Sequence, residues 1–182
     1  DNSARNEDID VLVSSIRNAT LDYNDMLNKA ENFFHERKQY IKKIPSIWPV
    51  EHNNSVRITS PFGYRIYPFT GKVTFHKGLD IAGQRNNRIL ATADGKVTDV
   101  WIYHRIYGRM VRIKHANGYE TLYGHMKSTW VREGQEVKRG DVLGVMGNTG
   151  KSKGRHLHYE VIKNGELENP IKYLSSNNVL TY

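Results

Sequence analysis

Two histidines one residue apart, His156 and His158, are the side chains of this chain with the clearest chemical potential. Residues two apart point to the same face of a β-strand but to nearly opposite sides of a helix. Because Leu157 and Tyr159 alternate with these histidines, the run predicts a strand with an apolar face and an imidazole face. Imidazoles side by side on one surface suit metal ligation or proton transfer.

A second pair of metal-ligand residue types, His76 and Asp80, lies four residues apart with Gly78 between them. This interval places both side chains on one side of an extended or gently bent segment, and Gly78 permits a close approach of the backbone. Alone, such a pair is common by chance. Together with His158, two imidazoles and one carboxylate leave a fourth tetrahedral position open for water, as in catalytic zinc sites. We therefore expect one Zn²⁺ per chain at His76, Asp80 and His158.

Two further histidines are candidates for proton transfer. His156 is left free beside the ligand His158, and His125 follows a predicted strand that can face it across the sheet. Zinc hydrolysis without a catalytic glutamate needs another base, and neutral imidazoles can serve. The other four histidines have structural interpretations on a helix, in a polar loop, in a hairpin and at a strand end: His35, His52, His104 and His115.

Composition narrows the class of protein. The 182 residues include no cysteine, which excludes disulfides, thiolate metal sites and a cysteine nucleophile. No apolar stretch approaches the roughly 20 residues that cross a bilayer. The net charge of +8 indicates a solvated basic surface or attraction to an anionic polymer. No nucleic-acid recognition motif accompanies the charge, so we expect no nucleic-acid partner, whereas an anionic cell envelope fits.

The first forty residues predict one long helix, from about residue 7 to 42, within an N-terminal segment 1–44. Apolar residues from Ile9 to Phe33 are spaced alternately by three and four, and no proline or glycine precedes Pro45. Two interpretations stay open. The helix either folds back on its own domain, where it can cover a cleft, or forms a coiled coil with a partner or a second copy through residues 7–42.

After this helix the pattern changes. Pro45 and Pro49 predict an extended linker over residues 45–55. From residue 56 to 174, short runs of period two alternate with turns such as Asn117-Gly118 and Asn164-Gly165. The predicted fold is mainly β, an antiparallel sheet or sandwich-like domain preceded by the long α-helix, with a C-terminal tail at 175–182.

Residues from about 58 to 174, two thirds of the chain, resemble the LytM-type, lysostaphin-like zinc endopeptidases of family M23. The match consists of several motifs in a fixed order rather than one short signature. These motifs are SPFGYR (60–65), FHKGLDIA (75–82), ATADGKV (91–97), YGH (123–125), GQEVKRG (134–140), GNTG (147–150), GRHLHYE (154–160), NP (169–170) and YL (173–174).

The resemblance implies a role for each candidate residue. The family's metal ligands fall on His76, Asp80 and His158, and its two non-ligand histidines fall on His125 and His156. Its members cut peptide bonds in the cross-bridges or stem peptides of bacterial peptidoglycan, which implies an extracytoplasmic location and peptidoglycan as partner. One non-ligand histidine is then expected to take the proton of a zinc-activated water, while the other binds the developing oxyanion.

Some relatives in this family have lost ligands and activate cell-wall amidases without catalysis, so a regulatory module is the alternative function. A biotinyl-type carrier barrel is disfavoured because no lysine-bearing hairpin turn of the required type is present. Three side chains have open roles. Arg65 binds a substrate carboxylate or supports a turn, Tyr67 is a possible oxyanion ligand, and Glu160 is expected as an exposed strand carboxylate, with orientation of a metal ligand as the alternative. The sequence pattern resembles that of enzymes that hydrolyse direct cross-links between stem peptides more than that of enzymes that hydrolyse glycyl-glycine bonds.

Overall fold

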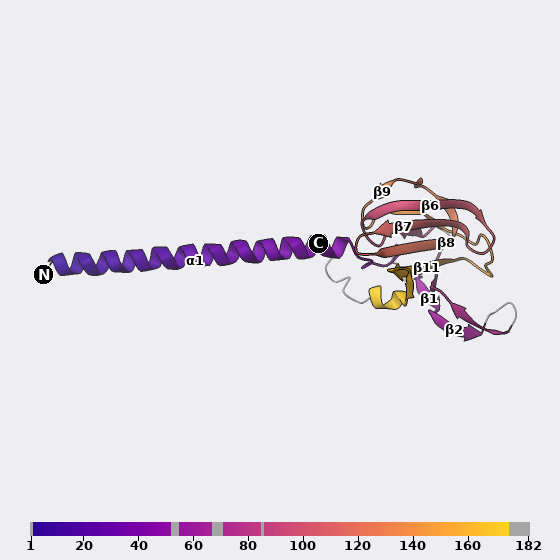
Figure 1. Cartoon of the computed structure of the whole chain (residues 1–182), viewed down its shortest axis with the longest axis horizontal. Helices are drawn as coiled ribbons and strands as arrows, with labels where there is room; N and C mark the ends of the chain where they lie inside the picture. Colours follow the sequence, from indigo (N-terminus) through magenta and orange to yellow (C-terminus); the bar gives the residue numbers. More distant parts are fainter. Residues whose placement is uncertain (1, 52–54, 67–70, 85, 175–182) are drawn as a thin grey trace. The chain divides into compact units, whose positions relative to one another are not determined.

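The computed structural model describes residues 2–51, 55–66, 71–84 and 86–174, with side chains from residue 9 onward. The chain divides into two compact units, one up to Tyr40 and one from Ile41 on, and each is described by itself (Figure 1). The elements are α1 (Asn2–Lys42), β1 (Arg57–Ser60), β2 (Gly63–Ile66), β3 (Val73–His76), β4 (Leu79–Ala82), β5 (Arg88–Leu90), β6 (Gly95–His104), β7 (Gly108–His115), β8 (Tyr119–Thr129), β9 (Glu136–Val137), β10 (Val142–Met146), β11 (His156–Lys163), β12 (Glu166–Glu168) and the short 3₁₀ helix η1 (Pro170–Tyr173).

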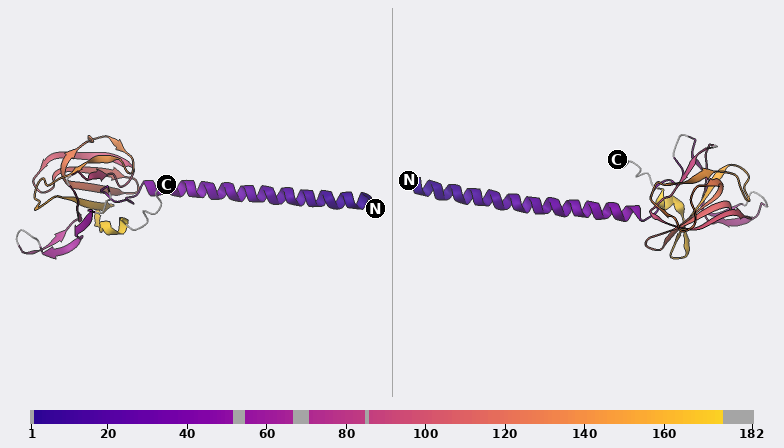
Figure 2. Two further views of the ribbon diagram at one scale, coloured as in Figure 1. Left: turned by 180° about the vertical axis from the view of Figure 1, so that it is seen from behind. Right: turned by 90° about the horizontal axis from the view of Figure 1, so that it is seen from above.

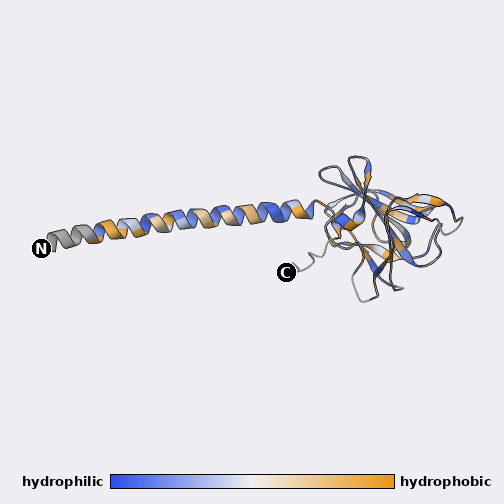
Figure 3. Cartoon of the chain, turned by 90° about the horizontal axis from the view of Figure 1, so that it is seen from below, coloured by the Kyte–Doolittle hydropathy of each residue, from blue (hydrophilic) through white to orange (hydrophobic). Residues whose placement is uncertain are grey.

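Helix α1 is one continuous helix of 41 residues, as its lack of glycine and proline predicts. Hydrophobic and hydrophilic residues alternate along it (Figure 3). The apolar positions of its heptad spacing are exposed on the helix, Met26 by 68%. An isolated helix with such a stripe gains most of its stability from packing against another surface. Packing against its own domain and pairing with a second helix both stay predictions of the heptad spacing.

The second unit is a β domain. Within the described residues, ten strands form one sheet whose pairs are all antiparallel, and β2 pairs with β3 in a separate hairpin (Figure 2). The central order is β1-β4-β11-β8-β7-β6-β9. Alternate side chains of these strands form a continuous apolar core that includes Ile81, Val111, Tyr123, Leu157 and Tyr159. The predicted fold, a mainly antiparallel β domain after one long helix, is confirmed.

Sheet register brings the candidate residues together. Strand β11 lies between β4 and β8, and His158 is the cross-strand neighbour of Asp80 on one side and Gly124 on the other. Opposed residues of neighbouring strands point to the same face. Residues 78 apart in sequence therefore meet because of strand pairing alone.

The segment before β1 packs on the β domain. Val50 is buried and forms a β-bridge with Ile89, and the Leu90 amide donates a hydrogen bond to the carbonyl of Pro49. Among the described residues, no helix combines the length and the apolar character that crossing a bilayer requires.

Candidate metal centre and cleft

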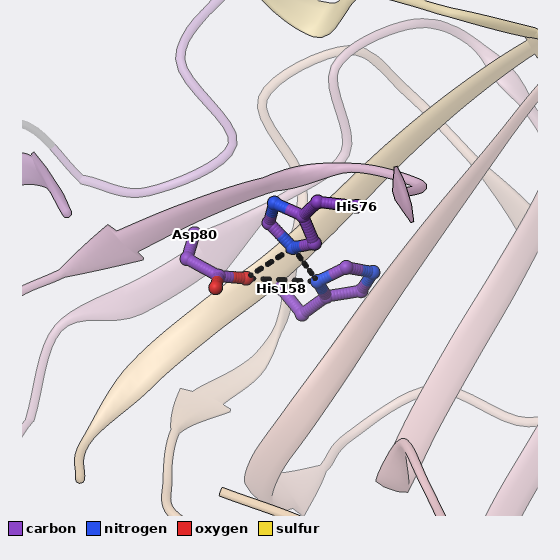
Figure 4. Close-up of side chains that lie close together, drawn as sticks. All are labelled: His76, Asp80 and His158. Carbon is purple, nitrogen blue, oxygen red and sulfur yellow. Dashed lines mark hydrogen bonds and ion pairs between the residues drawn. The ribbon is translucent and has the colours of Figure 1, made fainter. Parts of the chain in front are cut away.

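Three side chains converge at the edge where β3, β4 and β11 meet (Figure 4). The His76 Nε2 atom lies 3.1 Å from Asp80 Oδ1, and His158 Nδ1 lies 2.8 Å from the same oxygen. The two imidazole nitrogens are 3.2 Å apart. All three residues are buried and form a group of donor atoms that can hold a metal ion. The structure thus brings together the three side chains predicted as zinc ligands.

The remaining ring nitrogens fix which atoms face the centre. His76 Nδ1 lies 2.7 Å from the carbonyl oxygen of Pro61, and His158 Nε2 lies 3.0 Å from Glu160 Oε1. Because carbonyl and carboxylate oxygens only accept, each of these nitrogens carries a proton. If each ring carried only this one proton, both imidazoles would direct a lone pair toward Asp80 Oδ1, so the group needs a cation, either a metal ion or a further proton.

The distances between the donor atoms are compatible with a tetrahedral metal site of the kind that zinc forms. Bonds of about 2.0–2.1 Å in a tetrahedron give ligand-to-ligand edges of about 3.3 Å. The three observed edges, between 2.8 and 3.2 Å, are close to this value. Two imidazoles and one carboxylate are also a donor set that zinc accepts, and three protein ligands leave a coordination position for water or substrate.

Gly78 allows β4 to approach β11 closely enough to complete the group. A Cβ atom at Gly78 would collide with the carbonyl oxygen of Tyr159 and crowd the side chains of Glu160 and His158. The glycine between His76 and Asp80, noted from the sequence as permitting close approach, lies against the strand that carries the third candidate ligand.

Protonation of the metal-free group shows how strongly it attracts a positive charge. Burial by itself would raise the pKa of Asp80, but hydrogen bonds and charge from His158 and His76 lower that pKa far below its usual range. Burial would lower the pKa of His158, yet the hydrogen bonds with Asp80 and Glu160 raise it to about 9. A proton therefore occupies the group when a metal does not, and metal and proton compete for the same lone pairs.

The interpretation of Glu160 as an exposed strand carboxylate is wrong. Its side chain is buried, with 3% exposure, beneath Tyr107 from the turn between β6 and β7. Glu160 Oε1 accepts hydrogen bonds from His158 Nε2 and from the Tyr107 hydroxyl, the latter at 2.8 Å. Burial raises and the hydrogen bond from His158 lowers the pKa of Glu160, with the net direction downward, so the group stays ionised. Glu160 thus holds the ring of His158 with Nδ1 toward the centre.

Replacing Glu160 by glutamine is expected to weaken zinc binding by about 10- to 100-fold, the usual cost of losing a carboxylate behind a ligating histidine. Glutamine keeps the shape but removes the charge that orients and polarises the ring of His158. Competition with a chromophoric chelator measures the affinity. Glu166→Gln, at an exposed position of β12, is the matched control and should bind zinc as the wild type does. Equal affinities of E160Q and the wild type would contradict the assigned role.

His125 and His156, predicted as proton-transfer residues, face each other beside the three-residue group, with ring centroids 4.7 Å apart. His125 Nδ1 lies 2.7 Å from the Thr149 carbonyl oxygen, and His156 Nδ1 lies 2.8 Å from that of Gly154. Both rings therefore carry their proton on Nδ1 and present Nε2 as the basic atom. The Nε2 atom of His156 is 3.7 Å from Asp80 Oδ1, so this base lies next to the proposed metal position.

The backbone holds His125 in an uncommon conformation. Its φ of 59° lies in the left-handed region, which residues other than glycine adopt mainly where surrounding contacts enforce it. Here the His125 amide donates to the Tyr107 carbonyl oxygen at 2.7 Å, and the ring is held by Thr149. Burial, and then the charge of His156, lower the pKa of His125 to about 4. The imidazole is therefore neutral and able to accept a proton at neutral pH.

This lowered pKa predicts a pH dependence of stability. Between pH 6.5 and about 4 the unfolded chain binds a proton at His125 that the folded protein does not, so the free energy of unfolding falls as the pH falls. Relative to His125→Gln, wild-type protein should lose up to about 3 kcal/mol across this window and nothing above it. Urea unfolding of both metal-free proteins at several pH values measures the difference. A pH-independent difference between the wild type and H125Q would contradict the assignment.

A cleft of about 670 Å³ opens over these residues. Its walls come from the β2–β3 hairpin, the β6–β7 turn and the loop before β11. Arg65 projects into it with Nη2 3.4 Å from Asp80 Oδ2, on the side of that carboxylate away from the two histidines. The cationic side chains that line the cleft are those of Arg65, Lys77, Lys151 and Lys153.

Among the described residues of the β domain, His104 and His115 do not line the cleft. His115 is buried elsewhere, with Nε2 2.7 Å from the Thr121 hydroxyl, and burial lowers its pKa. His35 is exposed on α1, and His104 lies at the end of β6. His52 and Tyr67, the possible oxyanion ligand, lie outside the described residues.

Sequence reasoning missed the groups that fix the orientation of the rings. The carbonyls of Pro61, Thr149 and Gly154 carry no side-chain signal, although each belongs to a motif quoted above. Tyr107 was missed because it lies in a turn without period-two alternation. An aromatic residue in the turn that follows a predicted strand was the available signal.

Comparison with known proteins gives concordant results. The model of peptidase family M23 matches residues 74–170. The DD-carboxypeptidase/endopeptidase Mpg of Neisseria meningitidis is 44% identical over 115 residues, covering 63% of this chain and 26% of Mpg. The murein hydrolase activator NlpD of Escherichia coli is 41% identical over 124 residues, covering 64% of this chain and 32% of NlpD. This chain thus spans about a quarter to a third of the length of these curated relatives.

Among solved structures, a zinc-containing peptidase from Vibrio cholerae superimposes with a TM-score of 0.59 and 34% sequence identity. The alignment covers 71% of this chain and 38% of that one.

Proposed function

Because this chain belongs to peptidase family M23, we propose that it is a zinc-dependent endopeptidase that hydrolyses peptide cross-links or stem peptides of bacterial peptidoglycan. The observation that carries the proposal is the buried group of His76, Asp80 and His158, with donor distances that suit a tetrahedral zinc ion. A complete ligand set favours catalysis over a purely regulatory role.

Each residue of the site then has a task. Zinc, when bound by these three side chains, polarises the scissile carbonyl and lowers the pKa of water. His125 and His156 present basic Nε2 atoms to the cleft: one accepts the proton of the attacking water and delivers it to the leaving amine. The other, when protonated at Nε2, donates a hydrogen bond to the carbonyl oxygen as negative charge develops there. Glu160 and the Pro61 carbonyl keep the ligand rings oriented.

The charge of the cleft supports a preference among substrates. The lining of the cleft carries four cationic side chains, Arg65 and three lysines, and two acidic ones, Asp80 and Glu160, so positive charge is in excess. Such a lining attracts peptides with free carboxylates. Directly cross-linked stem peptides carry such carboxylates along the chain, whereas a glycine bridge offers only neutral peptide groups. We infer a preference for direct cross-links and an extracytoplasmic site of action, where this polymer lies.

The experiment that tests this function is digestion of defined cross-linked muropeptides, followed by identification of the new termini by mass spectrometry. Substrates with direct cross-links and with glycine bridges are compared at equal concentration. We expect new amino and carboxyl termini at a peptide bond of the directly cross-linked substrate, and slower cleavage of the bridged one. Intact substrates after prolonged incubation with zinc-loaded protein would overturn the proposal.

The similarity to NlpD favours one alternative, an activator of a murein hydrolase that cuts nothing itself. This alternative predicts that the protein releases no peptides alone but increases release by an added amidase. The two functions are separated by one assay with and without the amidase, since an endopeptidase acts in both.

A further inference from the structure

A second hollow lies on the β6–β7 hairpin, outside the proposed metal centre. It has a volume of about 190 Å³ and is lined by Asp99, Trp101, His104, Tyr107, Met110 and Arg112. Cross-strand pairing explains this grouping, because Asp99 is opposite Arg112 and Trp101 is opposite Met110 in the β6–β7 ladder. These side chains therefore share one face of the sheet.

The hollow and the metal centre lie on the same face. A row of paired residues crosses four strands, from Glu160 through Leu122 and Arg112 to Asp99. Tyr107 lines both the cleft and the hollow, and its ring lies 5.5 Å from that of His158 and 5.0 Å from that of His104. A polymer bound in the cleft can therefore extend into the hollow past Tyr107.

The wall of the hollow is aromatic. Trp101 is 49% exposed, and its ring meets that of His104 edge to face at 5.8 Å. His104 Nδ1 accepts hydrogen bonds from the amides of Ile106 and Tyr107, so the proton of the ring is on Nε2. A large indole surface held in place beside an N–H donor is suited to a flat ligand with apolar C–H groups and polar edges.

The floor of the hollow is polar. Arg112 Nε lies 4.0 Å from Asp99 Oδ2, which accepts a hydrogen bond from the Thr98 hydroxyl. Arg112 Nε is buried without a hydrogen-bond partner. Among the described side chains, the one other buried nitrogen or oxygen in this condition is Arg65 Nε, which belongs to a residue lining the proposed substrate cleft. A buried donor without a partner is costly unless a ligand or water satisfies it.

We propose that this hollow is a glycan subsite that binds one pyranose ring of the N-acetylated sugar strand to which the stem peptides are attached. The sugar ring stacks its C–H face on Trp101, while Asp99 and Arg112 bind its hydroxyl groups. An apolar peptide side chain could cover the indole of Trp101 but could not accept a hydrogen bond from the buried Arg112 Nε atom, whereas a sugar with its hydroxyl oxygens can do both. The subsite rests on the proposed function, because it places the strand beside the cleft in which the peptide is cut.

Binding is tested with chitotetraose, which contains N-acetylated sugars and no peptide, added to the zinc-free protein. The chain has three tryptophans, whose indole N–H signals are followed by NMR. The Trp101 signal should shift on titration, whereas that of Trp130, exposed by 58% outside both linings, should not. Trp101→Ala should weaken binding by about 5- to 10-fold, the usual effect of one aromatic stacking contact. Asp99→Asn should weaken it while retaining the indole, and Trp130→Ala should leave it unchanged.

A second readout separates this inference from the proposed function. Trp101→Ala should slow release from intact peptidoglycan and leave cleavage of a sugar-free cross-linked peptide unchanged. If the protein cuts neither substrate but chitotetraose still shifts Trp101, the proposed function fails and the sugar site stands. No shift of the Trp101 signal up to about 10 mM chitotetraose would overturn the subsite, because the dissociation constant would then lie above the millimolar range. A larger shift with the sugar-free peptide would overturn it too, because the hollow would then be a peptide site.

Discussion

Replacing His158 by alanine is expected to empty the metal centre and abolish hydrolysis together. His158 Nδ1 lies 2.8 Å from Asp80 Oδ1 and 3.2 Å from His76 Nε2, so the variant retains two of the three donors. It also leaves Glu160 buried without its histidine partner. Zinc content should fall from one ion per chain to near zero, and peptide release should fall by at least about a thousandfold, since polarisation of the carbonyl and activation of water are both lost.

Zinc content is measured by atomic absorption on the same preparation that is assayed for peptide release. His76→Ala should behave in the same way, because it removes another donor of the group. His35→Ala, a histidine change on the exposed surface of α1, should retain both zinc and activity. Because removing a buried side chain also destabilises the domain, circular dichroism must show that the variant is folded. A folded H158A protein with full zinc content would contradict the ligand assignment.

The second large loss of activity is expected on replacing His125 or His156, the two histidines near the metal centre that are not among its three ligands. His156→Ala and His125→Ala should each reduce turnover by about 10²- to 10⁴-fold, the range for loss of a general acid–base group. Both should retain one zinc per chain, because neither ring belongs to the three-residue group. The combination of lost turnover and retained zinc distinguishes these residues from His76 and His158.

The same variants separate the two histidines from each other. Replacement of the proton acceptor should remove the acidic limb of the pH–rate profile, whereas loss of the residue that stabilises the oxyanion should lower the rate at every pH. Loss of zinc from either variant would contradict the division between ligands and proton-transfer residues. Unchanged turnover in both would show that neither imidazole acts in the reaction.

The sequence predicted those parts of the structure that follow from periodicity. Absence of glycine and proline before Pro45 was enough for the long helix, and period-two alternation placed His156 and His158 on one face of β11. The sequence also predicted that His76, Asp80 and His158 form one group. That prediction came from their suitability as three zinc ligands with one position left open, and from the resemblance to the family.

What the sequence could not supply depends on contacts between distant segments. Strands β1 to β4 have four residues each, too few for alternation to stand out from turns. Alternation placed Glu160 on the imidazole face but gave no sign that Tyr107 covers it. The tautomers of the histidines depend on backbone carbonyls, which every residue has. The heptad spacing of α1 likewise does not distinguish packing on its own domain from pairing with a second helix.

The most direct test of metal-dependent hydrolysis is release of peptides from peptidoglycan by one preparation in three states: as purified, after removal of metal by a chelator, and after addition of one equivalent of zinc. The chelated protein should release nothing, and one zinc per chain should restore the original rate. Undiminished release by protein shown to be free of zinc and other metals would contradict the account, because His76, Asp80 and His158 would then serve another purpose.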